Sequence, residues 1–312
     1  MKIFLKNILF FVLFFIPMYL FCIVGYGLLM PESFKQNLNY KLGSYGFTFT
    51  RLKEAKKTKN VDVLILGSSH AYRGYDTSFF LKNGYKVMNL GTSAQTPLQT
   101  KILVERYIDE LNPKLIIYDI FPDLFTSDGL ESGLDIISNE KNHLDTFFMN
   151  FQMNHIKGYN LFVFSTFNDL INKKENYIQM NPKGSDFYVE GGYVEKDLSF
   201  FNVSKYKVND KFINWKPKQL KAFESILAKI KSKEIDLILI QAPVTSVFYK
   251  AQKENFKFDV KMKSYRYDYY NYNDKIVLND SLHFYDSSHL NKNGVFEFNQ
   301  KIIDLIKTKI KK

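Results

Sequence analysis

Cysteine is almost absent from this chain: Cys22 is the one cysteine among 312 residues, so no intramolecular disulfide can form. The sequence also lacks a GxGxxG segment and a phosphate-binding glycine loop, which argues against a nucleotide cofactor. Among the five histidines, His143, His155 and His283 have no metal-like spacing with one another or with the cysteine. We therefore expect neither a metal site nor a cofactor.

Acidic residues are outnumbered, with 32 Asp and Glu against 43 Lys and Arg, and the formal net charge is +11. The lysines are spread along the chain, with small clusters at 53–59 and 307–312. Neither cluster is interleaved with a recognisable nucleic-acid module, so we interpret them as a solvated surface and expect no nucleic-acid partner. Attraction to an anionic envelope polymer or lipid surface is the second interpretation.

Charged side chains are also missing from Ile8 to Met30. At about 1.5 Å per residue this run covers roughly 35 Å, enough to cross the apolar core of a bilayer. It is longer than the apolar part of a cleavable signal peptide and does not end in small residues, which favours an uncleaved anchor over residues 1–30. Because Lys2 and Lys6 precede the run, the sequence predicts a single-pass membrane protein whose remaining residues are extracytoplasmic, either periplasmic or at the cell surface.

Beyond a predicted helical juxtamembrane stalk at 31–60, short apolar runs alternate with segments of helical spacing. The predicted strands are 61–67, 86–90, 114–120 and 235–240, and the predicted helices are 76–82, 97–111, 218–231 and 291–309. Strands that alternate with helices imply parallel crossover units. Residues 61–312 are therefore predicted to form one α/β domain, an open sheet covered by helices on both faces.

Residues 123–216 interrupt this alternation with a stretch rich in Phe, Tyr and Asn. A hairpin is predicted around Gly191 and Gly192. We interpret the stretch as an insertion that caps the carboxyl edge of the sheet, because open α/β sheets bind their ligands at that edge.

Three polar segments lie where chemistry is expected. A serine in the segment GSSH, residues 67–70, follows the first strand and would be exposed at the ligand-binding edge near helix-start amides. Gly91 ends the second strand, where a glycine lets a backbone N–H approach a substrate oxygen. In DSSH, residues 286–289, the carboxylate can turn onto one imidazole nitrogen while the other faces a serine. Each segment also has a structural alternative, as an N-cap, a loop glycine or a helix start. Their order and setting favour nucleophilic catalysis.

These segments resemble the SGNH or GDSL-type serine hydrolases over residues 61–91 and 282–305, with weaker agreement at 115–122 and 237–243. The resemblance implies a flavodoxin-like three-layer sandwich with Ser69 as nucleophile, His289 as general base and Asp286 as its orienting partner. It also implies an oxyanion hole formed by the backbone amides of Ser69 and Gly91. The chain looks similar to the membrane-anchored branch that includes the D-alanyl-lipoteichoic acid and alginate O-acetylation proteins.

The sequence departs from the family pattern after the third strand, where the family usually has an asparagine as a further oxyanion donor. Residues 118–123 read YDIFPD instead. The loss of one such donor costs roughly 3 kcal/mol of transition-state stabilisation in a typical serine hydrolase. The missing asparagine argues more strongly against a general lipase than against a transferase. Near the nucleophile, His70 and Arg73 are candidates for contact with a polar substrate, although a turn role for His70 and a solvated Arg73 remain alternatives.

The resemblance implies acyl transfer, typically of an O-acetyl group, to a cell-envelope polysaccharide or glycolipid. A membrane-bound O-acyltransferase is the implied partner, because a cytoplasmic acyl donor has to cross the membrane. A carbohydrate or lipid esterase with the same triad is the first alternative, and a non-enzymatic envelope scaffold that keeps the fold is the second.

Overall fold

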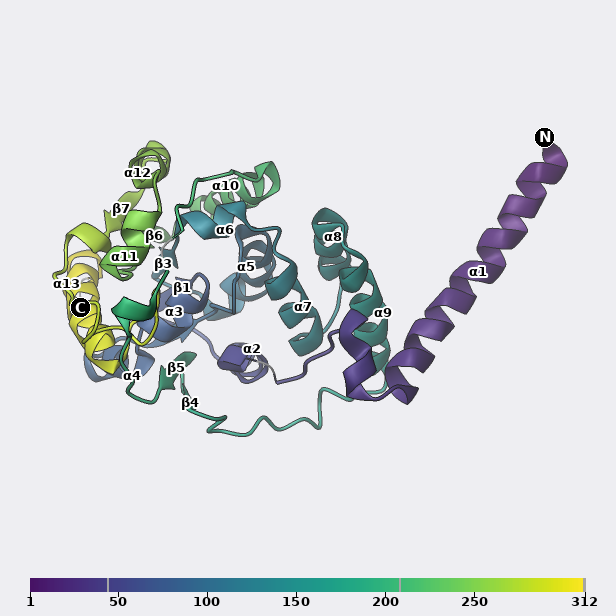
Figure 1. Ribbon diagram of the computed structural model, residues 1–312, viewed down its shortest axis with the longest axis horizontal. Coiled ribbons are helices and arrows are strands. Elements are labelled where there is room, and N and C mark those ends of the chain that lie inside the picture. Colours follow the sequence, from purple (N-terminus) through teal and green to yellow (C-terminus); the bar gives the residue numbers. More distant parts are fainter. Residues whose placement is uncertain (44, 208, 311–312) are drawn as a thin grey trace. The chain divides into compact units, whose positions relative to one another are not determined.

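The computed structural model describes residues 1–43, 45–207 and 209–310. The chain divides into two compact units, one made of Met1–Leu42 and Gly133–Ile178 and the other of Gly43–Ser132 and Gln179–Lys312. Figure 1 labels most of their helices and strands.

The second unit is built around a parallel sheet of five strands in the order β2-β1-β3-β6-β7. This is the flavodoxin-like order, in which β2 is added on one side of β1 and all later strands of the sheet are added on the other side. The strands are β1 (Val63–Leu66), β2 (Val87–Asn89), β3 (Leu115–Asp119), β6 (Asp236–Gln241) and β7 (Asp268–Asn271). The central strands β1 and β3 are buried along their whole length, as the continuous apolar runs in the sequence predict.

Helices cover both faces of this sheet (Figure 1). On one face, side chains of β1, β3 and β6 share a core with α3, α4 and the apolar stripe of α13, which includes Phe298 and Ile302. On the other face, Tyr118 of β3 packs against Phe223 of α10, and α10 packs along α5. The predicted α/β sandwich with a central parallel sheet is therefore confirmed.

The sequence located most elements of this unit but not all of them. Its helices are α2 (Thr48–Ala55), α3 (Ser69–Gly74), α4 (Thr77–Lys82), α5 (Pro97–Leu111), α6 (Pro122–Thr126), α10 (Pro217–Ser232), α11 (Ser246–Ala251), α12 (Asn255–Ser264) and α13 (Lys292–Lys309), with the short 3₁₀ turns η2 (Tyr45–Phe47), η3 (Val203–Lys205) and η4 (Tyr272–Asp274). The predicted hairpin is present as β4 (Asp186–Val189) and β5 (Tyr193–Lys196), joined through two glycines of positive φ. Strand β7 was missed because its sequence, DYYN, has no apolar run.

The first unit contains α1 (Lys2–Leu29), η1 (Glu32–Asn37), α8 (Leu144–Met153) and α9 (Ile156–Leu170), and α7 (Leu130–Asn139) runs across its boundary in the sequence. Helix α1 is long and apolar enough to cross a membrane or to serve as a signal sequence. It packs against α9, where the Tyr19 hydroxyl donates to Asn160 Oδ1 at 2.5 Å. A Cβ on Gly27 would lie 2.2 Å from the Phe164 ring, so glycine permits this close contact.

Candidate active site

Ser69 is the first residue of α3 and follows β1 after a sharp turn at Gly67 and Ser68. Gly67 has a φ of +145°, and a Cβ there would lie 2.8 Å from the Asp119 carbonyl oxygen. Glycine is therefore needed at this turn, both for its backbone conformation and for the close approach of β3. The turn leaves Ser69 half-buried at the carboxyl edge of the sheet.

His289 and Asp286 lie in the loop before α13, and the His289 side chain meets Ser69 across 220 positions of sequence. The backbone N–H groups of Ser288 and His289 each donate to Asp286 Oδ1 at 2.8 Å, which closes the loop into a tight turn. His289 Nδ1 lies 3.0 and 2.8 Å from the two Asp286 oxygens. His289 Nε2 lies 2.8 Å from Ser69 Oγ. The three side chains thus form one hydrogen-bonded chain from carboxylate to imidazole to hydroxyl.

The Asp286 carboxylate is kept ionised. Burial raises the pKa of Asp286, but the hydrogen bond and charge of His289 and the two backbone amides outweigh burial, so that the pKa lies below its usual value. An ionised Asp286 requires the proton of neutral His289 to be on Nδ1. Nε2 is then free to accept the proton of Ser69.

Neighbouring elements hold the imidazole in place. The hydroxyl and backbone N–H of Thr245, after β6, both donate to the Ser287 carbonyl, at 2.6 and 3.2 Å. The Tyr285 ring stacks on the His289 ring, with centroids 5.5 Å apart and planes 5° from parallel. Sequence reasoning missed Tyr285, although it stands directly before the DSSH segment.

The Arg73 side chain is largely buried and ion-paired, so the alternative of a solvated Arg73 is wrong. It makes a two-pronged ion pair with Asp186 of β4, at 3.0 and 2.8 Å, and its side chain is only 12% exposed. Its guanidinium also lies over the Tyr285 ring, at 5.8 Å. Burial lowers the pKa of Arg73, but the Asp186 hydrogen bond and the nearby side chains more than compensate. Asp186 could not be paired with Arg73 from the sequence because 113 positions separate them.

His70 is buried between the Phe121 ring, at 4.4 Å, and the His289 ring, at 5.2 Å. Burial, with a further contribution from the charge of His289, lowers the pKa of His70 to about 3, so the ring is neutral. With Arg73 and His289, it lines a small cavity of about 10 Å³. Substrate contact by His70 and Arg73 stays a prediction, and their place beside His289 is compatible with it.

The two amides expected to bind an oxyanion differ in their surroundings. Within the described residues, no acceptor is found for the N–H of Ser69, so this amide is available to a substrate oxygen. The N–H of Gly91 donates to Asn89 Oδ1 at 2.9 Å. A Cβ on Gly91 would lie 2.7 Å from the Ser68 carbonyl oxygen, so close packing also requires this glycine. Gly91 can serve as an oxyanion donor only if Asn89 gives up its hydrogen bond.

Asp119 has a structural role. It is fully buried at the end of β3, and its Oδ2 accepts a hydrogen bond from the Tyr75 hydroxyl at 2.8 Å. Burial raises the pKa of Asp119 to about 8, with the Tyr75 hydrogen bond acting in the opposite direction. The side chain is therefore protonated at neutral pH.

A protonated Asp119 makes the stability of the fold depend on pH. The pKa of the Asp119 carboxyl is 3.8 in the unfolded chain and about 8 in the folded protein. At a pH between these two values, the unfolded chain has lost the proton and the folded protein retains it. The free energy of unfolding therefore falls as pH rises through this window. We expect Asp119→Asn, which cannot ionise, to be more stable than the parent at pH 8 and to lose that advantage towards pH 4. Urea denaturation of both proteins between pH 4 and 9 measures this, and parallel pH profiles would show that Asp119 is ionised in the fold.

No family model matches the sequence, and a search of curated proteins gives no match. Solved structures similar to this chain include a GDSL-like lipase from Bacteroides thetaiotaomicron, with 14% identity, a TM-score of 0.43, and 86% of this chain and 100% of that chain covered. A candidate acylhydrolase from Bacteroides fragilis has 14% identity, a TM-score of 0.41 and coverage of 84% and 98%. A candidate lipolytic protein of the G-D-S-L family from Desulfitobacterium hafniense has 11% identity, a TM-score of 0.41 and coverage of 79% and 99%. These likenesses are distant.

Proposed function

We propose that the protein is an SGNH-type serine acyltransferase that forms an acyl-serine at Ser69. The observation that carries this proposal is the hydrogen-bonded chain from Asp286 to His289 to Ser69, with 2.8 Å between His289 Nε2 and Ser69 Oγ. A nucleophile within hydrogen-bond reach of a base that is itself oriented by a third group is the arrangement that nucleophilic catalysis requires.

The reaction has two steps. In the first, His289 takes the proton of Ser69 while Oγ forms a bond to the carbonyl carbon of an ester or thioester, and the Ser69 amide stabilises the oxyanion. The bond to the leaving group then breaks, and the leaving group receives the proton from His289. In the second, His289 takes the proton of an acceptor hydroxyl, which attacks the acyl-serine and restores the Ser69 hydroxyl. Water as acceptor gives an esterase, and a sugar hydroxyl gives a transferase.

One feature favours transfer to a bound acceptor over hydrolysis. The asparagine donor of the family is absent, and the nearby carboxyl of Asp119 is turned to Tyr75. In a site with few oxyanion donors, a positioned acceptor compensates for the lost stabilisation of the transition state. Fixing the reacting groups in place lowers the reaction barrier by several kcal/mol.

The acceptor we propose is a hydroxyl of a cell-envelope polysaccharide or glycolipid. An α1 helix that spans the membrane would keep the Ser69 unit at the extracytoplasmic surface, where such polymers lie. A donor made in the cytoplasm would then need a membrane-bound O-acyltransferase to deliver its acyl group.

The test compares release of the acyl group to water and to a glycan. Full-length protein in detergent is incubated with p-nitrophenyl acetate, and the rates of p-nitrophenol formation and of acyl-serine decay are followed with and without envelope glycans. We expect slow turnover in water and at least about tenfold faster decay with the acceptor, because a bound hydroxyl replaces a freely diffusing water.

Ser69→Ala serves as the background control for this assay, because it removes the proposed acyl carrier. Fast release in water that no envelope glycan changes would reject the transferase and establish the esterase. Absence of any acyl-serine with every donor tried would leave the scaffold as the function.

A further inference from the structure

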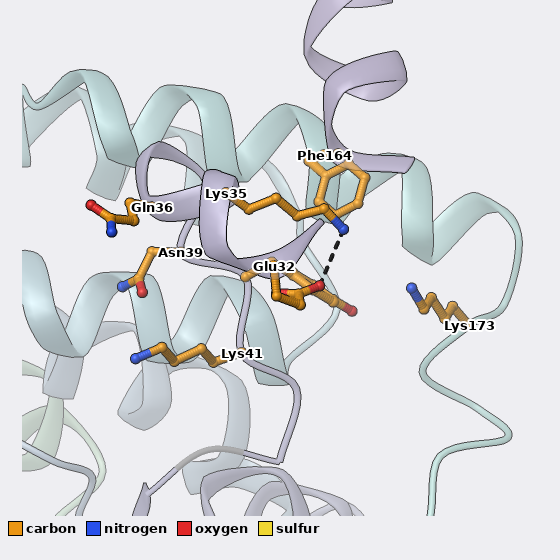
Figure 2. A pocket seen from close by; sticks show the side chains of 9 residues that line it. Glu32, Lys35, Gln36, Asn39, Lys41, Phe164 and Lys173 are labelled. Carbon is orange, nitrogen blue, oxygen red and sulfur yellow. Dashed lines mark hydrogen bonds and ion pairs between the residues drawn. The ribbon is translucent and has the colours of Figure 1, made fainter. Parts of the chain in front are cut away.

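The first unit holds a cavity beside the end of α1 (Figure 2). Its volume is about 110 Å³, and its walls come from Gly27 in the last turns of α1, from η1 and the residues up to Lys41, and from α9 with the segment that follows it. Three lysines, Lys35, Lys41 and Lys173, line it against a single carboxylate, Glu32. The cavity wall therefore has an excess of positive charge.

The polar groups of the cavity include a hydrogen-bond donor that has no acceptor. The Tyr40 hydroxyl is buried, and no hydrogen-bond partner for it is found within residues 1–43, 45–207 and 209–310. Its ring packs edge-on against Phe164, at 5.4 Å, and lies under the ammonium of Lys173, at 5.7 Å. Burial, with the nearby charge of Asp169, raises the pKa of Tyr40, which keeps the hydroxyl protonated. An unpaired buried donor beside lysines suits a ligand with anionic oxygens.

The position of the cavity indicates where that ligand would come from. Gly27 lies within one helical turn of Met30, where the charge-free run ends. If α1 spans a bilayer, the cavity therefore lies at the depth of the lipid headgroups. Several large apolar side chains of the same unit are exposed on α8 and α9: Leu144, Phe148, Phe151, Ile156 and Leu170. An exposed apolar surface beside a membrane helix fits contact with acyl chains.

We propose that this cavity binds the phosphate group of an anionic membrane lipid. Lys35 and Lys173 would neutralise the phosphate, and the Tyr40 hydroxyl would donate to one of its oxygens. Glu32 now pairs with Lys35 at 3.1 Å, but its side chain is 84% exposed and can turn into water when the phosphate takes its place. The proposal requires α1 to lie in a bilayer and does not depend on the chemistry at Ser69.

Lipid retention by the full-length protein in detergent tests the proposal. Native mass spectrometry measures binding of phosphatidylglycerol, of zwitterionic phosphatidylcholine and of inorganic phosphate to the parent, to Lys35→Ala/Lys173→Ala and to Tyr40→Phe. Lys141→Ala/Lys157→Ala is the matched control, because these lysines belong to the same unit but do not line the cavity. We expect the parent to prefer phosphatidylglycerol. The double variant Lys35→Ala/Lys173→Ala, the cavity pair, should bind phosphatidylglycerol more weakly than the parent, by about fivefold per lysine removed.

Tyr40→Phe keeps the ring contacts and removes only the hydroxyl, so we expect it to weaken phosphatidylglycerol binding roughly three- to tenfold. The control pair should change it less than twofold, and acylation at Ser69 should be the same in all variants. An equal loss in the control and cavity pairs would show unspecific attraction and overturn the proposal. Binding of inorganic phosphate as tight as that of phosphatidylglycerol would overturn the assignment to a lipid.

Discussion

Replacement of Ser69 by alanine is expected to lower the acyl-transfer rate by roughly 10⁴- to 10⁶-fold, to the level of the background reaction. The loss should be this large because the alanine has no atom that can carry the acyl group, and His289 then has no proton to accept. The rate of p-nitrophenol release from p-nitrophenyl acetate in the presence of the envelope glycan, in full-length protein purified in detergent, measures this effect.

The neighbouring serine provides a matched control. Ser68 precedes Ser69, and its hydroxyl is buried without a hydrogen-bond partner among the described residues. Ser68→Ala removes the same atom one position away, so we expect its rate to stay within a few-fold of the parent. If Ser68→Ala lost activity and Ser69→Ala retained it, the nucleophile would be misassigned.

Replacement of Asp286 by asparagine should have the next largest effect, a loss of about 10⁴-fold in kcat/KM. The asparagine Oδ1 can still accept the amides of Ser288 and His289, so the loop should keep its shape. Its amide group, however, would donate to His289 Nδ1 and move the imidazole proton to Nε2. In that tautomer Nε2 faces Ser69 with a proton and cannot act as a base.

Two measurements separate this explanation from a folding defect. The thermal melting temperature of Asp286→Asn should stay close to that of the parent, since the backbone hydrogen bonds of the loop persist. Asp304→Asn, a change at an exposed carboxylate on α13, should leave kcat/KM unchanged. A loss of less than about tenfold in Asp286→Asn would mean that the carboxylate does not orient the base.

Much of the sheet could be predicted because its central strands are buried on both faces and therefore read as continuous apolar runs. Helix α5 is found at the residues that its spacing predicts, because Thr96 and Gln99 cap its start and Pro97 occupies its first turn. Strand β7 carries tyrosines and polar residues, so no apolar run marked it. The helices α8 and α9 were also not predicted, because apolar side chains lie on their exposed sides as well as on their buried sides, as with the exposed Phe148 and the buried Met149 of α8, and this obscures the amphipathic spacing.

The approach of Ser69, Asp286 and His289 to one another could be predicted because the three residues lie in two short segments. GSSH follows a strand, DSSH precedes a helix, and parallel strands bring both to one edge of the sheet. The surroundings of these side chains depend on contacts across long stretches of sequence. Arg73 meets Asp186 of the hairpin, and His70 meets Phe121 after β3. The hydrogen bond from the Gly91 amide to Asn89 depends on the direction of the asparagine side chain, which the spacing of residues in the sequence does not give.

Trapping the acyl-enzyme shows whether Ser69 carries the acyl group. Full-length protein is mixed with p-nitrophenyl acetate, quenched in acid within the first turnover, digested and examined by peptide mass spectrometry. We expect a mass gain of one acetyl group on the peptide that contains Ser68 and Ser69, with fragmentation placing it on Ser69, and no gain in Ser69→Ala. An acetyl group on another residue, with Ser69 unmodified while p-nitrophenol is released, would show that Ser69 is not the nucleophile.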